Sequence, residues 1–350
     1  MIDVFDIRLT LFLSPIICVL LVLYFSRIAL RVGLIDDPDH RKQHRNSVPL
    51  VGGLAIWTTL AVVALLFPVP VGDHRLLLLC LLIILMTGVL DDFRELSARV
   101  RIIIQIIVAS ALVYFGDTVV RSLGEVFFIA QPYGLGYAAI PFSIVAIVGT
   151  INAFNMIDGH DGLSGGLISV SLLALAGLSF LRADDHALAL VVIVLTVLSF
   201  LWFNLGWAGE RRRVFLGDAG SMSLGLLVGF LLIKLSAPEV GVVKVAAAPW
   251  LIALPLLDMF GVMGFRIKEG RSPFHSDRTH IHHLLLAQGW GKSKVLLVLL
   301  FTQVILASVG MVGSIRNWND GLMIWGAFVI LGGYFLLLSK LRSSAGRERR

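Results

Sequence analysis

Long, nearly uncharged apolar runs alternate with short polar segments along the whole chain. The runs lack the apolar–polar alternation of a β-strand, and most approach the roughly 20 residues that a helix needs to cross a bilayer. Because only helices and closed barrels satisfy their own backbone groups inside a bilayer, continuous runs predict transmembrane helices. We predict eleven spans, at Leu9–Tyr24, Leu50–Val71, Leu76–Leu90, Val100–Val119, Tyr137–Ile151, Gly162–Leu181, Ala187–Phe203, Ser221–Leu235, Val245–Phe265, Val295–Ser314 and Leu322–Leu341.

The composition agrees with an apolar solvent around the chain. Of the 350 residues, 57% are hydrophobic and 15% are charged, and the mean hydropathy is +0.90. A soluble domain of this length cannot bury so much apolar surface, because interior volume grows too slowly with chain length. The linkers are short and leave no room for a separate soluble domain. The sequence therefore predicts an all-α integral membrane protein with one polytopic domain over residues 1–350.

Two features of the apolar runs bear on processing and redox chemistry. The first run has no basic region before it and no clear small-residue cleavage site after it, so we interpret it as a retained helix rather than a signal peptide. Cys18 and Cys80 both lie inside apolar runs. They imply neither a disulfide framework nor a cysteine-based metal site, and we interpret them as small hydrophobic residues of helices.

The basic residues predict an orientation. With the N-terminus outside and the C-terminus inside the cell, all but seven of the 29 Lys and Arg residues fall on the inside. The positive-inside rule favours this arrangement, which explains the net charge of +6 without a nucleic-acid partner. The seven outside residues are Arg8, Arg75, Arg121, Arg182, Lys234, Lys244 and Arg316.

Five polar segments fall on this same inside face, at about residues 27–49, 91–100, 152–162, 204–221 and 266–294. They mix carboxylates with basic and histidine side chains, although positive charge is what this face favours. Carboxylates that hold Mg²⁺, next to basic groups that hold phosphate, are typical of phosphoryl-transfer sites. Oxygen ligands suit Mg²⁺ or Mn²⁺ better than zinc.

The acidic pairs leave alternatives open. Asp91 and Asp92 could be solvated loop charges, but two adjacent carboxylates are costly without a cation. Asp158 and Asp161 would share one face if the segment were helical. Otherwise the segment is a tight loop in which Gly159 and Gly162 let a ligand approach the backbone. The segment from Gly217 begins a span, so its free backbone N–H groups predict an anion site.

The histidines also allow more than one interpretation. His280, His282 and His283 follow Asp277 closely. Their imidazoles could contact phosphate or take part in acid–base chemistry. They could also form a zinc site with Asp277 as fourth ligand, or lie in solvent. Asp258 lies inside a span, where a carboxylate is expensive and has either a structural or a catalytic role.

Together these motifs resemble the polyprenyl-phosphate N-acetylhexosamine-1-phosphate transferase superfamily, glycosyltransferase family 4. The resemblance covers the chain from about Asp36 to Trp290, with the motifs in the same order. The form His-x-His-His is similar to the branch that makes undecaprenyl-pyrophosphoryl-GlcNAc, whereas the phospho-MurNAc-pentapeptide branch has three contiguous histidines. The motifs are Asp91-Asp92, Asn152-x-x-Asn155-x-x-Asp158-Gly159-x-Asp161-Gly162, Phe215-Leu216-Gly217-Asp218-x-Gly220-Ser221 and His280-Ile281-His282-His283.

The resemblance implies roles for individual residues. Within the motifs, Asp161 would face uracil and Phe215 would pack on the base, and Asp92 is the candidate general base. The implied metal ligands for Mg²⁺, or Mn²⁺, are Asp218, Asp91 and Asn155. The implied catalytic residues are Asp91, Asp92, Asp158, His280 and His283. The implied substrate-binding residues are Lys42, Arg45, Asn152, Asn155, Asp161, Asn204, Phe215, Arg266 and His282.

The expected reaction moves an N-acetylhexosamine 1-phosphate, with GlcNAc as the first expectation and QuiNAc or FucNAc as others, from a UDP-sugar to undecaprenyl phosphate. It releases UMP and starts O-antigen or related polysaccharide synthesis at the cytoplasmic face of the bacterial inner membrane. The expected partners are UDP-N-acetylhexosamine, undecaprenyl phosphate, membrane lipids and a second copy in a homodimer, with no nucleic acid.

Three alternatives accompany this expectation. The first is the phospho-MurNAc-pentapeptide branch of the same superfamily. The second is a transporter, which would bind cargo near the bilayer midplane, whereas the span centres here are nearly free of charge. The third is a CDP-alcohol phosphotransferase, whose Asp-Gly-x-x-Ala-Arg signature is missing from the sequence.

Overall fold

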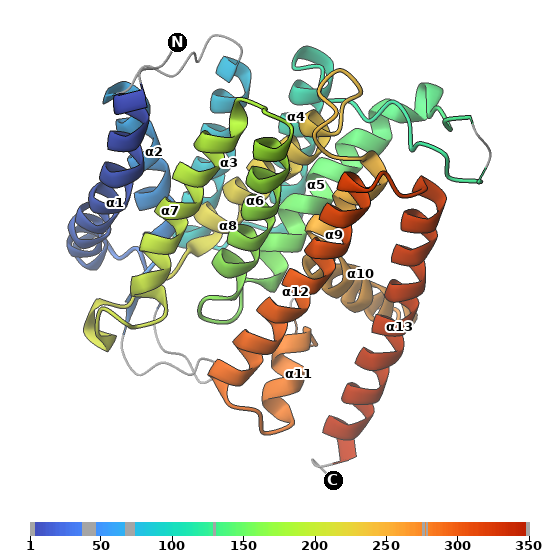
Figure 1. Cartoon of the computed structure of the whole chain (residues 1–350). Helices are drawn as coiled ribbons and strands as arrows, with labels where there is room; N and C mark the ends of the chain where they lie inside the picture. Colours follow the sequence, from blue (N-terminus) through green and yellow to red (C-terminus); the bar gives the residue numbers. More distant parts are fainter. Residues whose placement is uncertain are drawn as a thin grey trace.

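Helices make up most of the chain and pack side by side in one bundle (Figure 1). The computed structural model describes residues 4–36, 47–66, 74–128, 131–274, 277 and 279–347. The described chain begins at the upper end of the bundle in Figure 1 and finishes at the lower end. The α-helices are α1 (Val4–Val32), α2 (Gly52–Leu66), α3 (Arg75–Arg94), α4 (Ala98–Phe115), α5 (Ala139–Ile157), α6 (Leu163–Leu181), α7 (His186–Asn204), α8 (Gly217–Leu235), α9 (Ala248–Leu251), α10 (Ala253–Lys268), α11 (Ile281–Ala287), α12 (Lys292–Ile315) and α13 (Asp320–Arg347).

Short elements connect these helices. Three 3₁₀ turns occur within the described residues: η2 (Gly136–Ala138), η3 (Glu210–Arg212) and η4 (Val245–Ala247). Strands β1 (Ile35–Asp36) and β2 (Val48–Pro49) pair antiparallel, with Ile35 opposite Pro49. Just beyond β2, Leu50 forms a parallel bridge with Phe215, which ties this segment to the start of α8.

Nine helices of the described chain are long and apolar enough to cross a membrane, and each coincides with a predicted span. The chain is therefore an all-α polytopic membrane protein, as predicted. The predicted span Leu50–Val71 contains α2, a shorter apolar helix, next to residues outside the described ranges. The predicted span Val245–Phe265 contains η4, α9 and α10, which bend by 79° at a break. The count of eleven spans and the orientation stay predictions.

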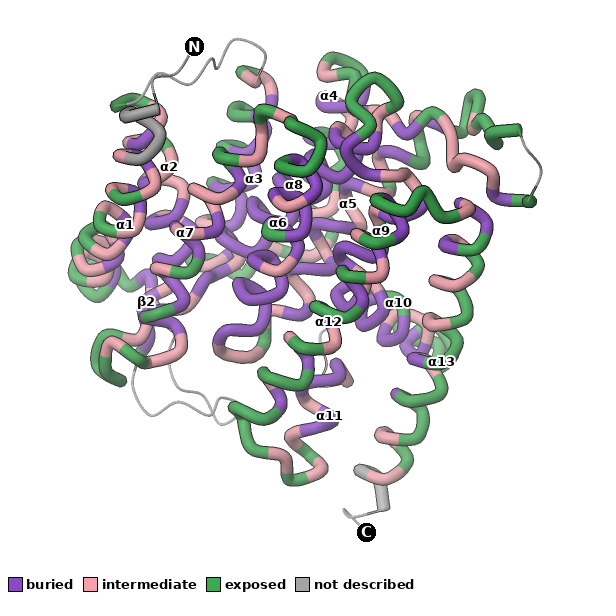
Figure 2. The backbone as a smooth tube through the Cα atoms, in the orientation of Figure 1, coloured by how far each residue is buried: buried purple, intermediate pink, exposed green. Residues whose placement is uncertain are grey.

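The outer surface of the bundle is apolar and its centre is closely packed. Large hydrophobic side chains such as Phe12, Phe180 and Val329 are exposed, which suits a lipid surrounding. Helix α8 is almost entirely buried and lies in the middle of the bundle (Figure 2). Glycines allow this packing, since a Cβ on Gly53 would lie 2.3 Å from Gly220 N and one on Gly88 2.3 Å from Ala219 Cα.

The break between α9 and α10 exposes backbone groups inside the bundle, and a buried glutamine satisfies them. Gln303 Nε2 donates to Leu251 O at 2.7 Å, and Gln303 Oε1 accepts from Leu254 N at 2.9 Å. Ser171 Oγ also donates to Leu251 O at 2.7 Å. Side chains of neighbouring helices can replace the missing helical bonds in this way, which is why a membrane protein tolerates such a break.

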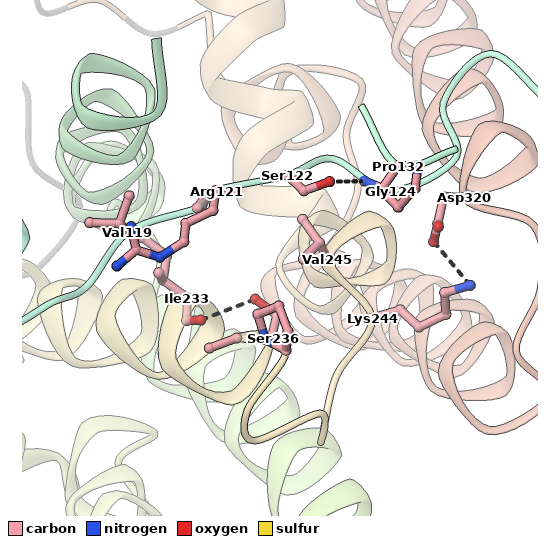
Figure 3. Close-up of a pocket in the computed structure, with 13 residues that line it drawn as sticks. Val119, Arg121, Ser122, Gly124, Pro132, Ile233, Ser236, Lys244, Val245 and Asp320 are labelled. Carbon is pink, nitrogen blue, oxygen red and sulfur yellow. Dashed lines mark hydrogen bonds and ion pairs between the residues drawn. The ribbon is translucent and has the colours of Figure 1, made fainter. Parts of the chain in front are cut away.

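A small cavity of about 210 Å³ lies at the C-terminal end of α8 (Figure 3). Its lining includes Arg121, Ile233, Lys244 and Asp320. Lys244 Nζ pairs with Asp320 Oδ1 at 3.0 Å, so these two charges are matched within the wall. Since α8 rises about 1.5 Å per residue, this cavity lies roughly 27 Å from the polar residues at the other end of the helix.

Candidate functional site

Helices distant in sequence meet at the N-terminal end of α8, around Asp218. Asn155 at the end of α5 donates from Nδ2 to Asp218 Oδ1 at 2.6 Å. Arg101 in the first turn of α4 places Nη1 2.6 Å from Asp91 Oδ2 and 3.7 Å from Asp218 Oδ2. The carboxyl groups of Asp91 and Asp218 lie within hydrogen-bonding reach of each other. We call Asp91, Asp92, Asp158 and Asp218 the acidic cluster.

Asp91 and Asp92 are neighbours in sequence but have different surroundings. Successive residues of a helix point about 100° apart, so the two carboxylates approach different atoms of α8. Asp91 is buried, and its Oδ1 accepts from Leu96 N at 2.6 Å. Asp91 thus contacts the side chains of Arg101 and Asp218, whereas Asp92 contacts the backbone of α8.

Asp92 caps helix α8. Its Oδ1 accepts from Asp218 N at 2.8 Å and its Oδ2 from Ala219 N at 3.2 Å. An anion at a helix N-terminus is favourable because free N–H groups and the helix dipole both attract it. The predicted anion site at this helix start is therefore occupied by a carboxylate of the chain itself. Gly217 permits the contact, since its φ is +74° and a Cβ there would lie 2.6 Å from Asp92 Oδ2.

Residues 158–162 form a loop between α5 and α6, so the glycine-loop alternative describes them rather than a helical face. Gly162 has a φ of +78°, a conformation that favours glycine. Burial raises the pKa of Asp158 well above its ordinary value, and the negative charges of Asp218, Asp92 and Asp161 raise it further. The loop therefore brings a fourth carboxylate to the cluster where negative charge already accumulates.

Two predicted substrate-binding residues hold neighbouring loops together. Asn204 at the end of α7 accepts from Gly162 N at 2.6 Å and donates to Val214 O at 2.9 Å. Asp161 lies 3.3 Å from Arg213 Nη1. Asn204 thus connects the loop after α5 to the segment before α8, and a contact with a nucleotide is not needed to explain its buried amide.

Two other predicted substrate-binding residues differ in their access to this end of the bundle. Phe215 is half-buried, and its backbone accepts from Gly52 N and donates to Pro49 O, both at 2.9 Å. Asn152 points along α5 into the bundle, where Nδ2 donates to Gln105 Oε1 at 2.6 Å and to Val148 O at 2.8 Å. The structure therefore brings Phe215 to the loops around the cluster but places Asn152 one helical turn deeper.

The segment His280–His283, which we call the histidine segment, begins with a residue held by buried partners. His280 Nδ1 lies 2.7 Å from Asp258 Oδ2, and Ile281 N donates to Asp258 Oδ1 at 2.9 Å. Tyr334 of α13 donates its hydroxyl to the same Oδ1 at 2.9 Å. These three contacts fit the structural role of the two considered for Asp258, which holds His280 with its Nε2 3.5 Å from Arg266 Nη2.

Arg266 is buried and paired rather than directed at open space. Its Nη2 donates to Asp277 Oδ1 at 2.9 Å, and its Nη1 donates to Pro273 O at 2.8 Å. Burial alone would raise the pKa of Asp277, but hydrogen bonds from Arg266 and Thr279 outweigh it and hold that pKa well below the ordinary value. The zinc interpretation loses its fourth ligand here, because Asp277 is engaged by the guanidinium.

The middle of the histidine segment contacts the loop of Asp158. A Cβ on Gly159 would lie 2.7 Å from His282 Nε2 and 3.7 Å from His283 Nε2. Burial lowers the pKa of His282 well below its ordinary value, and the neighbouring imidazoles His283, His280 and His160 lower it further. His282 is buried, whereas His283 is half-buried and so combines contact with this loop and access to solvent.

The donor set of the acidic cluster fits a hard divalent cation by its chemistry. Carboxylate oxygens are what Mg²⁺ and Mn²⁺ take, and the charges of Asp218, Asp92 and Asp161 add to burial in raising the pKa of Asp158. Within the described ranges, no group of three or more His, Cys, Asp or Glu side chains is arranged to hold an ion by itself. Mg²⁺ commonly completes its shell with substrate phosphate oxygens and water.

Three residues at this site were missed by the sequence reasoning. Arg101 and Arg213 were counted only as positive-inside charges, although each lies beside an acidic motif in the chain. Gln105 was not considered, although a lone amide inside an apolar run is itself a signal. Lys42 and Arg45, predicted to meet phosphate, lie outside the described residues.

The fold and the site together define a class: a polytopic helical membrane protein with an oxygen-rich, acidic site at one end of its bundle. The profile of glycosyl transferase family 4 matches residues 74–236, which include the whole acidic cluster. Undecaprenyl-phosphate alpha-N-acetylglucosaminyl 1-phosphate transferase of Yersinia pestis is 33% identical over 316 residues, which are 87% of this chain and 85% of the relative.

Two further relatives carry the same name. The Escherichia coli (strain K12) protein is 33% identical over 304 residues, which are 85% of this chain and 82% of the relative. The Pasteurella multocida (strain Pm70) protein is 32% identical over 317 residues, which are 89% and 87% of the two chains. With such identity over most of both chains, the protein belongs to glycosyl transferase family 4.

Proposed function

We propose that this protein transfers GlcNAc 1-phosphate from UDP-GlcNAc to undecaprenyl phosphate. The observation that carries the proposal is the meeting of Asp91, Asp158 and Asp218 at one end of the bundle. These residues come from three separate segments of a chain about a third identical to transferases of that name. Lipid-linked GlcNAc pyrophosphate formed in this way would start O-antigen or a related surface polysaccharide.

The reaction balances without a redox partner or a covalent enzyme intermediate. An oxygen of the lipid phosphate forms a bond to the phosphorus that carries the sugar. The bond between that phosphorus and the oxygen that leads to UMP breaks, and its electron pair leaves with UMP. Since a lipid phosphate is already mostly anionic near neutral pH, positioning and electrostatics can supply most of the rate.

A bound Mg²⁺, or Mn²⁺, would draw charge from the phosphate oxygens and so favour the leaving of UMP. The residues proposed to hold it are Asp218, Asp91 and Asn155, whose side chains already meet. Their oxygens are hard donors, and a cation beside them would offset the repulsion among the neighbouring carboxylates of the cluster. Metal dependence is therefore part of the proposal.

The other residues have proposed roles that follow from their contacts. Arg101 carries a guanidinium with several N–H donors and stands beside two carboxylates, where it can contact a phosphate oxygen. Asp158, whose pKa burial raises well above its ordinary value, holds a proton to a higher pH than an exposed carboxyl does, so we propose it as a proton carrier. Asp92 is bound by two backbone N–H groups, so we propose that it positions α8 rather than acting as the base.

We propose the eleven-span topology with the N-terminus in the periplasm and the acidic cluster at the cytoplasmic face of the inner membrane. The described chain begins and ends at opposite ends of the bundle (Figure 1), which supports an odd number of spans. The excess of Lys and Arg in the polar segments at the same end of the bundle as the acidic cluster supports the orientation. A homodimer remains a prediction from the resemblance.

The test is a release assay on the purified full-length chain in detergent. With UDP-GlcNAc, undecaprenyl phosphate and Mg²⁺, UMP should appear, and omission of the lipid or addition of EDTA should stop it. Mg²⁺ or Mn²⁺ should restore the activity after EDTA, and Zn²⁺ should not. UDP-QuiNAc, UDP-FucNAc and UDP-MurNAc-pentapeptide serve as competing donors.

Release of UMP from UDP-MurNAc-pentapeptide alone would reassign the chain to the other branch. No release from any donor, with uptake of a nucleotide sugar into proteoliposomes, would favour a transporter.

A further inference from the structure

Gln105 places an amide in the interior of α4, between apolar residues that face the membrane or the core. The residue is 1% exposed, although its neighbours in sequence are isoleucine and valine. A buried amide without hydrogen bonds costs about 1–3 kcal/mol in proteins, so its presence needs a partner. None of the roles proposed above uses Gln105.

The partners of Gln105 lie on two other helices. Its Oε1 accepts from Asn152 Nδ2 of α5 at 2.6 Å, and its Nε2 lies 3.5 Å from Met222 Sδ of α8. Sulfur is a weak acceptor, so the bond to Asn152 is the stronger of the two. A polar contact thus joins three helices inside the bundle, where competing water is scarce.

This contact lies one helical turn below the acidic cluster on every helix involved. Residues three or four apart on a helix lie above one another on the same face. Each of the three helices therefore contributes one residue to the cluster layer and one to the layer beneath it. The pairs are Arg101 above Gln105 on α4, Asn155 above Asn152 on α5, and Asp218 above Met222 on α8.

We propose that the Gln105–Asn152 pair is a positioning device, which sets the rotation of α4 against α5 so that Arg101 and Asn155 both meet Asp218. This inference rests on the proposed function for its kinetic test. Under this inference, Asn152 is a positioning residue rather than a substrate-binding residue.

The geometry favours positioning over stability as the main effect of the pair. A single internal hydrogen bond contributes only about 1 kcal/mol to stability. A shift of about 1 Å at a reacting group, in contrast, can lower a rate by roughly 100-fold. Arg101 reaches Asp218 at 3.7 Å while it holds Asp91 at 2.6 Å, so a small rotation of α4 would change which carboxylate it neutralises.

The experiment is a double-mutant cycle in the full chain with Gln105→Met, Asn152→Leu and both together. Each single variant should lower kcat for UMP release by about 10- to 100-fold, with KM for UDP-GlcNAc within about twofold of the wild type. The double variant should lose no more activity than the single variants, because the two residues act as one unit. The thermal midpoint of the double variant should lie above those of the single variants, since removal of both partners leaves no unpaired group.

Gln303→Met provides the matched control, because Gln303 is also a fully buried helical glutamine but bonds the break at Leu251. It should lower the thermal midpoint and leave kcat within about twofold. Full kcat in Gln105→Met would overturn the inference. The inference would also be overturned if the losses in kcat multiplied in the double variant, or if kcat recovered there together with the thermal midpoint.

A wild-type chain that releases no UMP would instead contradict the proposed function. The cycle would then be measured by thermal unfolding and by cross-linking of cysteines placed on α4 and α5. Additive effects on unfolding, or cross-links unchanged in Gln105→Met, would still refute the positioning device.

Discussion

The acidic cluster and the histidine segment lie at the same end of the bundle, but their polar groups are used differently. Around the histidine segment, Asp258 accepts from three donors and Arg266 is paired with Asp277, so charge is matched inside the protein. In the acidic cluster, carboxyl groups from separate segments lie close together, and their charges add to burial in raising the pKa of Asp158. The first arrangement maintains a shape, whereas the second retains binding capacity for a ligand.

This difference gives a criterion for reading roles from contacts. A charged side chain whose bonding capacity is fully used by buried partners acts on structure, and its loss leaves a partner unpaired. A side chain in an unbalanced group costs stability and is retained for function. Substitutions around the histidine segment should therefore change stability more than activity, and substitutions in the acidic cluster should change activity more than stability.

The largest expected effect is the loss of activity in Asp218→Asn. The amide removes the central charge between Asn155 and Arg101 while it preserves the size of the side chain. UMP release should fall by about 10³-fold or more, as expected when an electrostatic group at the reacting phosphate is removed. Thermal unfolding checks that the variant is folded, and full activity under saturating Mg²⁺ would take Asp218 out of the metal site.

Arg266→Met should have the largest effect on stability. It leaves the carboxylate of Asp277 without its buried guanidinium, which costs about 3–5 kcal/mol for a buried ion pair. Denaturant unfolding in detergent micelles measures the change. Arg271→Met is the control, because Arg271 is exposed and lies 3.8 Å from the same carboxylate, so it should cost less than about 1 kcal/mol. Equal losses in both variants would show that burial does not decide the effect.

Asp158→Asn should increase stability while it lowers activity. The fold raises the pKa of Asp158, so folding favours the protonated form of this group. Its contribution to the free energy of unfolding is therefore fully present below its ordinary pKa of about 4 and is lost as the pH rises above that value. Asparagine removes this loss, so the variant should melt above the wild type at pH 7 in Mg²⁺-free buffer. The difference should vanish toward pH 4. A variant that melts below the wild type at pH 7 would contradict the assignment.

The smallest effect is expected for Tyr334→Phe. The substitution removes one of three donors to Asp258, so it should cost about 1 kcal/mol and leave turnover within about threefold. The fully exposed Tyr137 gives the matched control, in which phenylalanine should change neither quantity. A loss of activity as large as that of Asp218→Asn would show that the hydroxyl takes part in more than packing.

Much of the fold could be predicted because the solvent dictates it. An apolar bilayer forces helices of a given length, so nine predicted spans coincide with helices of the described chain. The break before α10 has a local signal in Pro255, which has no N–H to donate to Leu251 O. The side chain that satisfies this carbonyl could not be predicted, because Gln303 lies about fifty residues further along the chain. Composition reports how much apolar surface exists, not which amide seals a break.

The candidate site was predictable in its membership but not in its contacts. The sequence pointed to Asp91, Asp158 and Asp218 as carboxylates on one face, and the structure brings them together. It could not show that Asp92 caps a helix 126 residues later, nor that Asn152 turns inward. Such pairings depend on helix rotation, which is set by packing among many side chains and leaves no local pattern.

The contacts of Gly53 and Gly88 with the first turn of α8 have a consequence for how the protein can vary. These surfaces meet backbone to backbone, so they contain no rotamer that could yield to an added methyl group. An alanine at either position can be accommodated only if a whole helix slides. The spacing of the carboxylates in the acidic cluster is thus set by the backbone packing, and substitutions can change the side chains around it but have little freedom to widen it.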